Sequence, residues 1–171
     1  MSTAHAMTIR PQPDQPLDWS ALADRLRRVA RALAGPRRPD LADDLVQDAI
    51  ARLLARESSP PTYPYARAAL VRIYLDHERA AQRRAARAVR WALTRPRVHL
   101  DTAAGGRSAA LHSALDRLSP TQRAVLVLRL VEDLPTDAVA QALETSPRVV
   151  RASLHTARAR MRDHLRKEAA P

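Results

Sequence analysis

The residues of this chain that are best suited to chemistry are basic, and they gather in its last third. Between Arg148 and Lys167 there are seven basic residues and one acid, whereas the stretch from Leu130 to Pro147 has four acids and no Lys or Arg. Arginine makes paired hydrogen bonds to phosphate and to guanine, so a helix with this charge suits the major groove of DNA. A merely solvated helix face is the plainer alternative.

A second basic run extends from Arg79 to Leu100 and contains seven Arg and no acid. Aromatic residues flank it, with Tyr63, Tyr65 and Tyr74 before the run and Trp91 near its end. Arginine beside aromatic rings suits single-stranded nucleic acid, whose bases stack and whose phosphates are neutralised. Tyr65 and Tyr74 can equally be core residues, but the Arg stripe favours a binding function.

Acids and an amide cluster near the start of an earlier expected helix, at Asp43, Asp44, Gln47 and Asp48. The helix dipole favours negative charge at this end, so helix capping explains the cluster in part. A docking surface for a protein partner is the sharper interpretation.

Catalytic and metal-binding residues show no productive spacing. The six His are scattered without the pairing of an HExxH site, at positions 5, 77, 99, 112, 155 and 164. The chain has no glycine-rich phosphate loop and no nucleophile motif. It also has no Cys, which excludes disulfides and thiolate ligands. We therefore expect no enzyme activity, no catalytic residue, no metal and no cofactor.

Helices must position the basic and acidic groups. The apolar spacing predicts helices over residues 18–34, 40–57, 64–92 and 108–118. Asp18 and Ser108 are expected to cap the first and the fourth of these, and Asp40 with Asp43 to open the second. Gly35 ends the first helix, and a proline-rich loop precedes the third.

The stretch from residue 119 to 167 predicts a helix, a short helix and a long basic helix. Ser119 can cap the first of these, with Pro120 and Gln122 in the positions of a capping box. Pro135 opens the short helix, and a break at residues 144–147 stops it. The basic helix is expected to bury Val150, Leu154, Ala157, Met161 and Leu165. Two short helices followed across a sharp turn by a basic one predict a helix-turn-helix that binds DNA.

Composition agrees with an all-α fold. The chain has 171 residues, 46% of them hydrophobic, with no Phe and few aromatics, so Leu, Val and Ala must fill the core. The net charge of +11 indicates anionic partners. No apolar run approaches the roughly 20 residues that span a membrane, and no signal-peptide core is present. We expect a cytoplasmic protein that does not interact with membranes.

The order of these motifs resembles a bacterial RNA polymerase sigma factor. The acid-led DDLVQD helix, the YxRxxLVxxYLDxxR helix that runs into Arg, and LSPTQRAVLVLRLVEDL before the helix-turn-helix are similar to the extracytoplasmic-function (ECF) group of the sigma-70 family. The likeness is greatest to its actinobacterial SigE-like subset. It implies two small helical domains joined by a linker. The implied divisions are a tail (1–16), region 2 (17–92), the linker (93–107) and region 4 (108–171).

The resemblance also implies partners and site residues. Region 2 is expected to bind the clamp helices of the polymerase β′ subunit through Asp43, Asp44, Leu45, Gln47 and Asp48. Its −10 element contacts, including the melted non-template strand, are expected from Tyr63, Arg67, Arg72, Arg79, Arg83 and Arg84. Region 4 is expected to hold the β flap and to read duplex DNA at the −35 element. The helical wheel assigns this reading to Arg148, Arg151, Ala152, His155, Thr156 and Arg158, and an anti-sigma factor is a further possible partner.

Several residues depart from the pattern of this family. Its common Gly-Thr-Val-Lys-Ser-Arg stands here as Arg148-Val149-Val150-Arg151-Ala152-Ser153, and a turn Gly is replaced by Glu144. Arg72 takes the place of a usual Asn. A degenerate paralogue that binds polymerase, or a helix-turn-helix regulator that acts alone, therefore stays open as an alternative. The linker would permit a closed form in which the DNA-binding faces are hidden.

Overall fold

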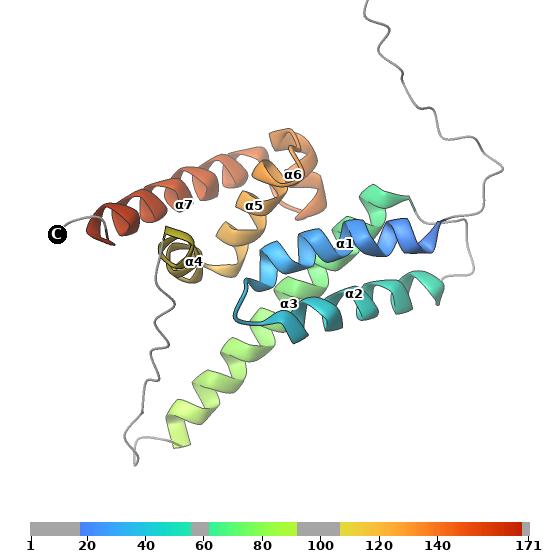
Figure 1. Ribbon diagram of the computed structural model, residues 1–171, viewed down its shortest axis with the longest axis horizontal. Helices are drawn as coiled ribbons and strands as arrows, with labels where there is room; N and C mark the ends of the chain where they lie inside the picture. Colours follow the sequence, from blue (N-terminus) through green and yellow to red (C-terminus); the bar gives the residue numbers. More distant parts are fainter. Residues whose placement is uncertain (1–17, 56–61, 92–106, 169–171) are drawn as a thin grey trace, which may run out of the picture.

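The computed structural model describes residues 18–55, 62–91 and 107–168, and in these ranges it contains helices and no strand (Figure 1). The helices are α1 (Trp19–Ala34), α2 (Pro39–Leu54), α3 (Tyr63–Trp91), α4 (Arg107–Asp116), α5 (Pro120–Leu130), α6 (Thr136–Ala142) and α7 (Pro147–Glu168). The expected all-α class is confirmed. The expected tail and nearly all of the expected linker lie outside the described residues.

Helices α1, α2 and α3 pack on one another and form an N-terminal bundle. Asp18 caps α1 as expected, since its carboxylate accepts hydrogen bonds from the backbone N–H of Ser20 (2.9 Å) and of Ala21 (3.0 Å). Gly35 ends this helix at φ 76°, a conformation that favours glycine. The expected opening of α2 by Asp40 is wrong, because the helix begins at Pro39 and Asp40 already lies in its first turn.

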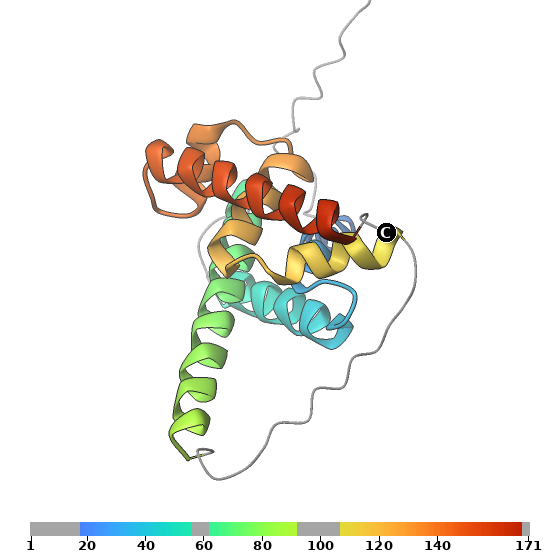
Figure 2. The same cartoon turned by 90° about the vertical axis from the view of Figure 1, so that its left-hand side faces the viewer.

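Helix α3 is long, and its two halves lie in different environments. Its first half packs against α1 and α2, with Leu70, Val71 and Tyr74 almost fully buried. Its second half extends past the bundles into solvent (Figure 2). This half carries the first part of the Arg run, so those charges lie away from the core.

Helices α4 to α7 form a C-terminal bundle in which α7 packs against the other three. The predicted capping box is present, because the Ser119 hydroxyl accepts from the Gln122 N–H (3.3 Å) and the Gln122 side chain accepts from the Ser119 N–H (3.1 Å). The expected cap at Ser108 is wrong, since α4 already begins at Arg107.

The turn between α6 and α7 completes the helix-turn-helix. Glu144 has φ 51°, in the left-handed region where glycine is usual. The Thr145 N–H donates to the Ala140 carbonyl (2.9 Å) and closes the end of α6. The Ser146 hydroxyl accepts from the Val149 N–H (3.3 Å) at the start of α7.

The two bundles pack against each other in what we call the closed arrangement. Helices α1 and α3 contact α5, and α3 also contacts α6. One apolar cluster runs through both bundles, and it includes Leu33 and Leu70 from the first and Val125, Leu128 and Val139 from the second. The two bundles therefore adopt a closed form, but it hides only part of the expected DNA-binding surface, because the basic face of α7 and the later arginines of α3 stay exposed.

Candidate nucleic-acid interface

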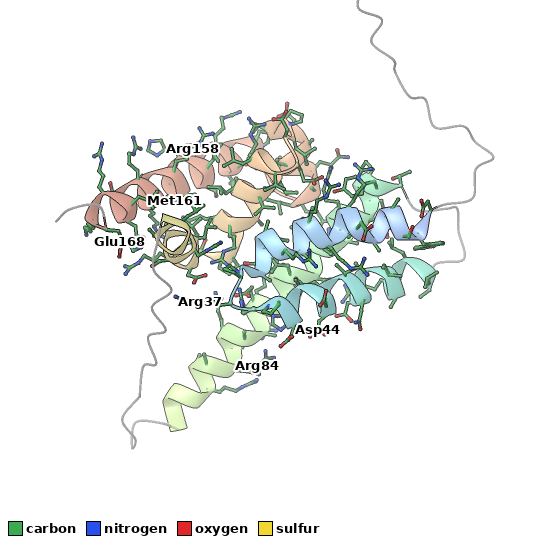
Figure 3. All side chains as sticks on the ribbon, in the orientation of Figure 1. Arg37, Asp44, Arg84, Arg158, Met161 and Glu168 are labelled. Carbon is green, nitrogen blue, oxygen red and sulfur yellow. The ribbon has the colours of Figure 1, made fainter. Side chains whose placement is uncertain are left out.

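Helix α7 presents a basic face to solvent on the side away from the core. All six side chains that the helical wheel assigned to DNA are exposed, namely Arg148, Arg151, Ala152, His155, Thr156 and Arg158. On the opposite side, Val150 and Ala157 are fully buried. Figure 3 shows Arg158 on the outer side of α7 and Met161 turned toward the α4–α5 side. The predicted inner and outer faces are therefore present, but three of the five positions expected to be buried, Leu154, Met161 and Leu165, are only half-buried.

The residues expected at the −10 element fall into two groups. Arg79, Arg83 and Arg84 are exposed on the later part of α3, where Arg79 pairs with Asp76 (3.1 Å). Figure 3 shows Arg84 on the half of α3 that projects into solvent. These side chains can reach a nucleic acid without any rearrangement of the two bundles.

Tyr63, Arg67 and Arg72 form the second group, and all three contact acids of the C-terminal bundle. The Tyr63 hydroxyl donates to Glu132 (2.7 Å), and Arg67 donates to the same carboxylate oxygen (3.0 Å). Arg72 pairs with Glu144 at 2.6 Å. In the closed arrangement Glu132 and its neighbours leave Arg67 only 8% exposed, and its contact with the −10 element stays a prediction.

Tyr63 is held between cations as well as against Glu132. The Arg25 guanidinium carbon lies 3.4 Å from the centre of the Tyr63 ring, and that of Arg67 lies 5.3 Å away. Burial, and then the hydrogen bond and negative charge of Glu132, raise the pKa of Tyr63 to about 12. The phenol therefore stays protonated near neutral pH and acts as a hydrogen-bond donor.

The acidic cluster on α2 is presented to solvent with one exception. Asp43, Asp44, Gln47 and Asp48 are exposed, and Figure 3 shows Asp44 on the side of α2 that faces away from α7. Leu45 is only 2% exposed and lies in the core. The expectation that its side chain belongs to a docking surface is therefore wrong, because α2 turns this position toward α1 and α3.

An apolar groove of about 500 Å³ lies beside the basic face of α7. Its floor is made by Leu126, Leu130, Met161 and Leu165, and its edges by Arg158, Arg162 and Arg166. Leu130 is 59% exposed, which is high for so large an apolar side chain. Such a groove suits an apolar segment that also carries acids.

Sequence reasoning missed residues that hold Tyr63 in place and residues that join the two bundles. Glu132 and Arg25 gave no local signal, because each acts on a residue far away along the chain. Glu144 was singled out only as a replacement for a turn glycine. Arg123, buried between the bundles, was not singled out at all.

Within the described ranges, no three His, Cys, Asp or Glu side chains gather in a way that could hold a metal ion. No helix in those same ranges is both long and apolar enough to cross a bilayer.

Comparisons with known proteins agree with the geometry of the helix-turn-helix. The family model described as Sigma-70, region 4 matches residues 108–161. The RNA polymerase sigma-E factor of Streptomyces coelicolor is 35% identical over 148 residues, which cover 83% of this chain and 80% of that protein. The sigma-E factor of Streptomyces antibioticus is 34% identical over 126 residues, which cover 72% and 70%.

Two solved structures share the fold at 20% sequence identity. One is the sigma factor RpoE in complex with the anti-sigma factor NepR from Bartonella quintana, with a TM-score of 0.63 over 86% of this chain and 93% of that one. The other is the PhyRSL–NepR complex from Sphingomonas sp. Fr1, with a TM-score of 0.55 over 86% of each chain.

Proposed function

We propose how this chain, which belongs to the ECF group of the sigma-70 family of RNA polymerase sigma factors, directs transcription to particular promoters. The chain binds the polymerase core, reads the −35 element with α7 and reads the −10 element with α3. The polymerase core supplies the catalysis. The observation that carries the proposal is the exposed basic face of α7 on a helix-turn-helix.

Charge and position support the reading of duplex DNA by α7. Arg148 and Arg151 lie at the start of this helix, where a recognition helix enters the major groove. Bidentate contacts from Arg to guanine discriminate between bases, and contacts to phosphate position the helix. His155, Thr156 and Arg158 extend the same exposed face along the helix.

The polymerase contacts are assigned to two separate surfaces. Asp43, Asp44, Gln47 and Asp48 form an exposed acidic surface on α2, which suits the β′ clamp helices. The apolar groove beside α7 suits the β flap, since its floor is apolar and its edges are basic. The similar complexes contain an anti-sigma factor, so such a protein is a candidate partner of this chain too. We place the action of this chain in the cytoplasm, with the polymerase.

Reading of the −10 element requires the two bundles to separate. Tyr63, Arg67 and Arg72 are proposed to contact the melted strand, but Glu132 and Glu144 occupy them in the closed arrangement. Docking on the two polymerase surfaces supplies the binding energy that holds the bundles apart. Capturing an extruded base then costs a few kcal/mol of unstacking, which stacking and phosphate contacts offset.

Run-off transcription on genomic DNA tests the proposal. Polymerase core is assayed alone and with the purified chain, and the new 5′ ends are sequenced. Discrete new start sites that share two upstream elements are expected. The absence of new start sites from a mixture in which the chain still binds core would favour the degenerate paralogue. The absence of both start sites and core binding would favour a regulator that acts alone.

A further inference from the structure

The exposed face of α7 carries a stripe of apolar groups among its cations. Val149 is 46% exposed, and Ala152 and Thr156 are exposed as well. These positions are three and four residues apart, so the three side chains lie along one side of the helix. A β-branched apolar side chain so open to water at the start of a recognition helix suggests a partner that covers it.

Thr156 adds a methyl group to this stripe. Its hydroxyl donates to the Ala152 carbonyl one turn earlier at 3.0 Å, so its hydrogen-bonding capacity as a donor is used within the helix. The methyl group of Thr156 is then left for apolar contact with a partner. The stripe therefore offers methyl groups at all three positions.

Two positions of this stripe carry no hydroxyl group. They are Val149 and Ala152, which a Thr and a Ser would supply with a hydroxyl group. Val is isosteric with Thr and carries a methyl group in place of the hydroxyl, whereas Ala lacks the hydroxyl group of Ser without replacing it. Both positions therefore lack a hydrogen-bonding group, and Val149 also adds apolar surface.

Cations beside the stripe identify the class of partner. Arg148, Arg151 and His155 lie exposed along one side of the stripe, and Arg158 follows one turn later. This pairing of positive charge with methyl groups matches the major groove, where phosphates line the edges. The 5-methyl group of thymine is the apolar group that base pairs present there.

We propose that Val149, Ala152 and the methyl group of Thr156 contact the 5-methyl groups of thymines in the −35 element. This inference rests on the proposed function, and it states which base this chain selects with its apolar stripe. Arg148 and Arg151 would position the helix and read neighbouring guanine or phosphate. The −35 element of this sigma factor is then expected to contain thymines at the bases that face the first two turns of α7.

Deoxyuridine tests the contact because it removes only the methyl group. Promoters found by run-off transcription are prepared with each −35 thymine replaced in turn, and their affinity for the holoenzyme of core and full-length chain is measured. A contacted thymine should lose about four-fold in affinity, the value of one buried methyl group. Replacement of thymines outside the two promoter elements should change nothing.

Variants that introduce a hydroxyl group assign the effect to the stripe. Val149→Thr and Ala152→Ser place hydroxyl groups at exposed positions, so the fold should not change. In each variant the loss of affinity caused by deoxyuridine should shrink toward one-fold at one or two thymines. Ala51→Ser, an exposed substitution on α2, serves as the matched control and should keep the full loss.

Two results would overturn the inference. One is a holoenzyme that starts transcription at discrete sites but is insensitive to deoxyuridine throughout the −35 element. The other is a loss of affinity on deoxyuridine replacement that stays the same in both hydroxyl variants. A failure of the proposed function itself is distinguishable, because the chain would then produce no discrete start sites at all.

Discussion

The guanidinium group of Arg123 donates a hydrogen bond to the backbone carbonyl of Leu33 at 3.1 Å, across 90 residues of sequence. Leu33 lies in the last turn of α1, where carbonyl groups lack helical partners and a positive charge is favourable. Arg123 also donates to the Leu115 carbonyl (2.6 Å) and to Asp116 (2.9 Å), and it is only 4% exposed. One buried side chain therefore ties the end of α1 to α4 and α5.

Replacement of Arg123 by Met should destabilise the closed arrangement. The substitution leaves two carbonyl groups and the Asp116 carboxylate without this donor. Breaking a buried pair costs about 3–5 kcal/mol, and the lower end applies here because Asp116 is 40% exposed in its side chain. Urea unfolding of the variant and of the native chain measures the change in the free energy of unfolding. Arg117→Met removes an exposed Arg nearby and should shift the free energy of unfolding by less than about 0.5 kcal/mol. Equal effects in the two variants would contradict the stabilising role of Arg123.

Glu144 should show opposing backbone and side-chain effects on stability. Its left-handed backbone is unfavourable by about 1–2 kcal/mol for a residue with a Cβ atom. Its ion pair with Arg72 is well exposed, so it contributes only about 0.2–1 kcal/mol. Glu144→Gly and Glu144→Gln both lose the ion pair, but only the first relieves the backbone. The Gly variant should thus be the more stable of the two by about 1 kcal/mol in thermal or urea unfolding, and the reverse order would be inconsistent with a strained turn.

Tyr63 should make stability depend on pH in the alkaline range. Its pKa is raised from the ordinary value of 10.0 to about 12, first by burial and then by Glu132, so the folded state favours the protonated phenol. The stabilisation is complete below pH 10 and is lost as the pH rises from 10 to 12, because the unfolded chain releases its proton first. Urea unfolding at several pH values should show this loss in the native chain. In Tyr63→Phe the alkaline decline should be smaller, and an identical decline in both chains would disprove the linkage.

Local features of the fold could be predicted from the sequence because they depend on neighbouring residues. The capping box at Ser119, the cap at Asp18 and the inner face of α7 each follow from residues within two turns of a helix. Ser108 was misplaced because a good capping residue can also stand inside a helix. Leu45 was misassigned because a motif shared with a family includes residues that support a surface from within.

The contacts between bundles could not be predicted, because they join residues that are far apart and have no periodic signature. Arg67 and Glu132 are 65 residues apart, and Arg123 and Leu33 are 90 apart. Arg123 is also one of many arginines in a chain whose net charge is +11, so its type alone carried no information. Only the packing of α5 on α1 and α3 distinguishes it from the arginines on the surface.

Charge reversal at Asp44 should weaken binding to the polymerase core. Asp44 is exposed on α2 among other acids. A positive charge there would repel the basic surface of a partner that these acids attract. Asp44→Arg should bind core roughly ten-fold more weakly, as measured by fluorescence anisotropy of the labelled chain. Asp24→Arg makes the same charge change on the exposed surface of α1 and should bind nearly as the native chain does. Equal weakening by both variants would point to net charge in place of a docking surface.

A reversible cross-link between Arg72 and Glu144 tests whether the closed arrangement must open for initiation. The chain has no Cys, so Arg72→Cys with Glu144→Cys places two unique thiols where the ion pair stood. A bismaleimide with an internal disulfide would join α3 to the α6–α7 turn and hold Tyr63 and Arg67 against Glu132. Because apparent affinity falls with the fraction of competent molecules, promoter initiation by the bridged holoenzyme should fall roughly ten-fold or more. Reduction of the bridge should restore it in the same sample, and the two single-Cys variants treated with the reagent control for its attachment. Undiminished initiation by the bridged chain would mean that this sigma factor reads its promoter without separating the two bundles.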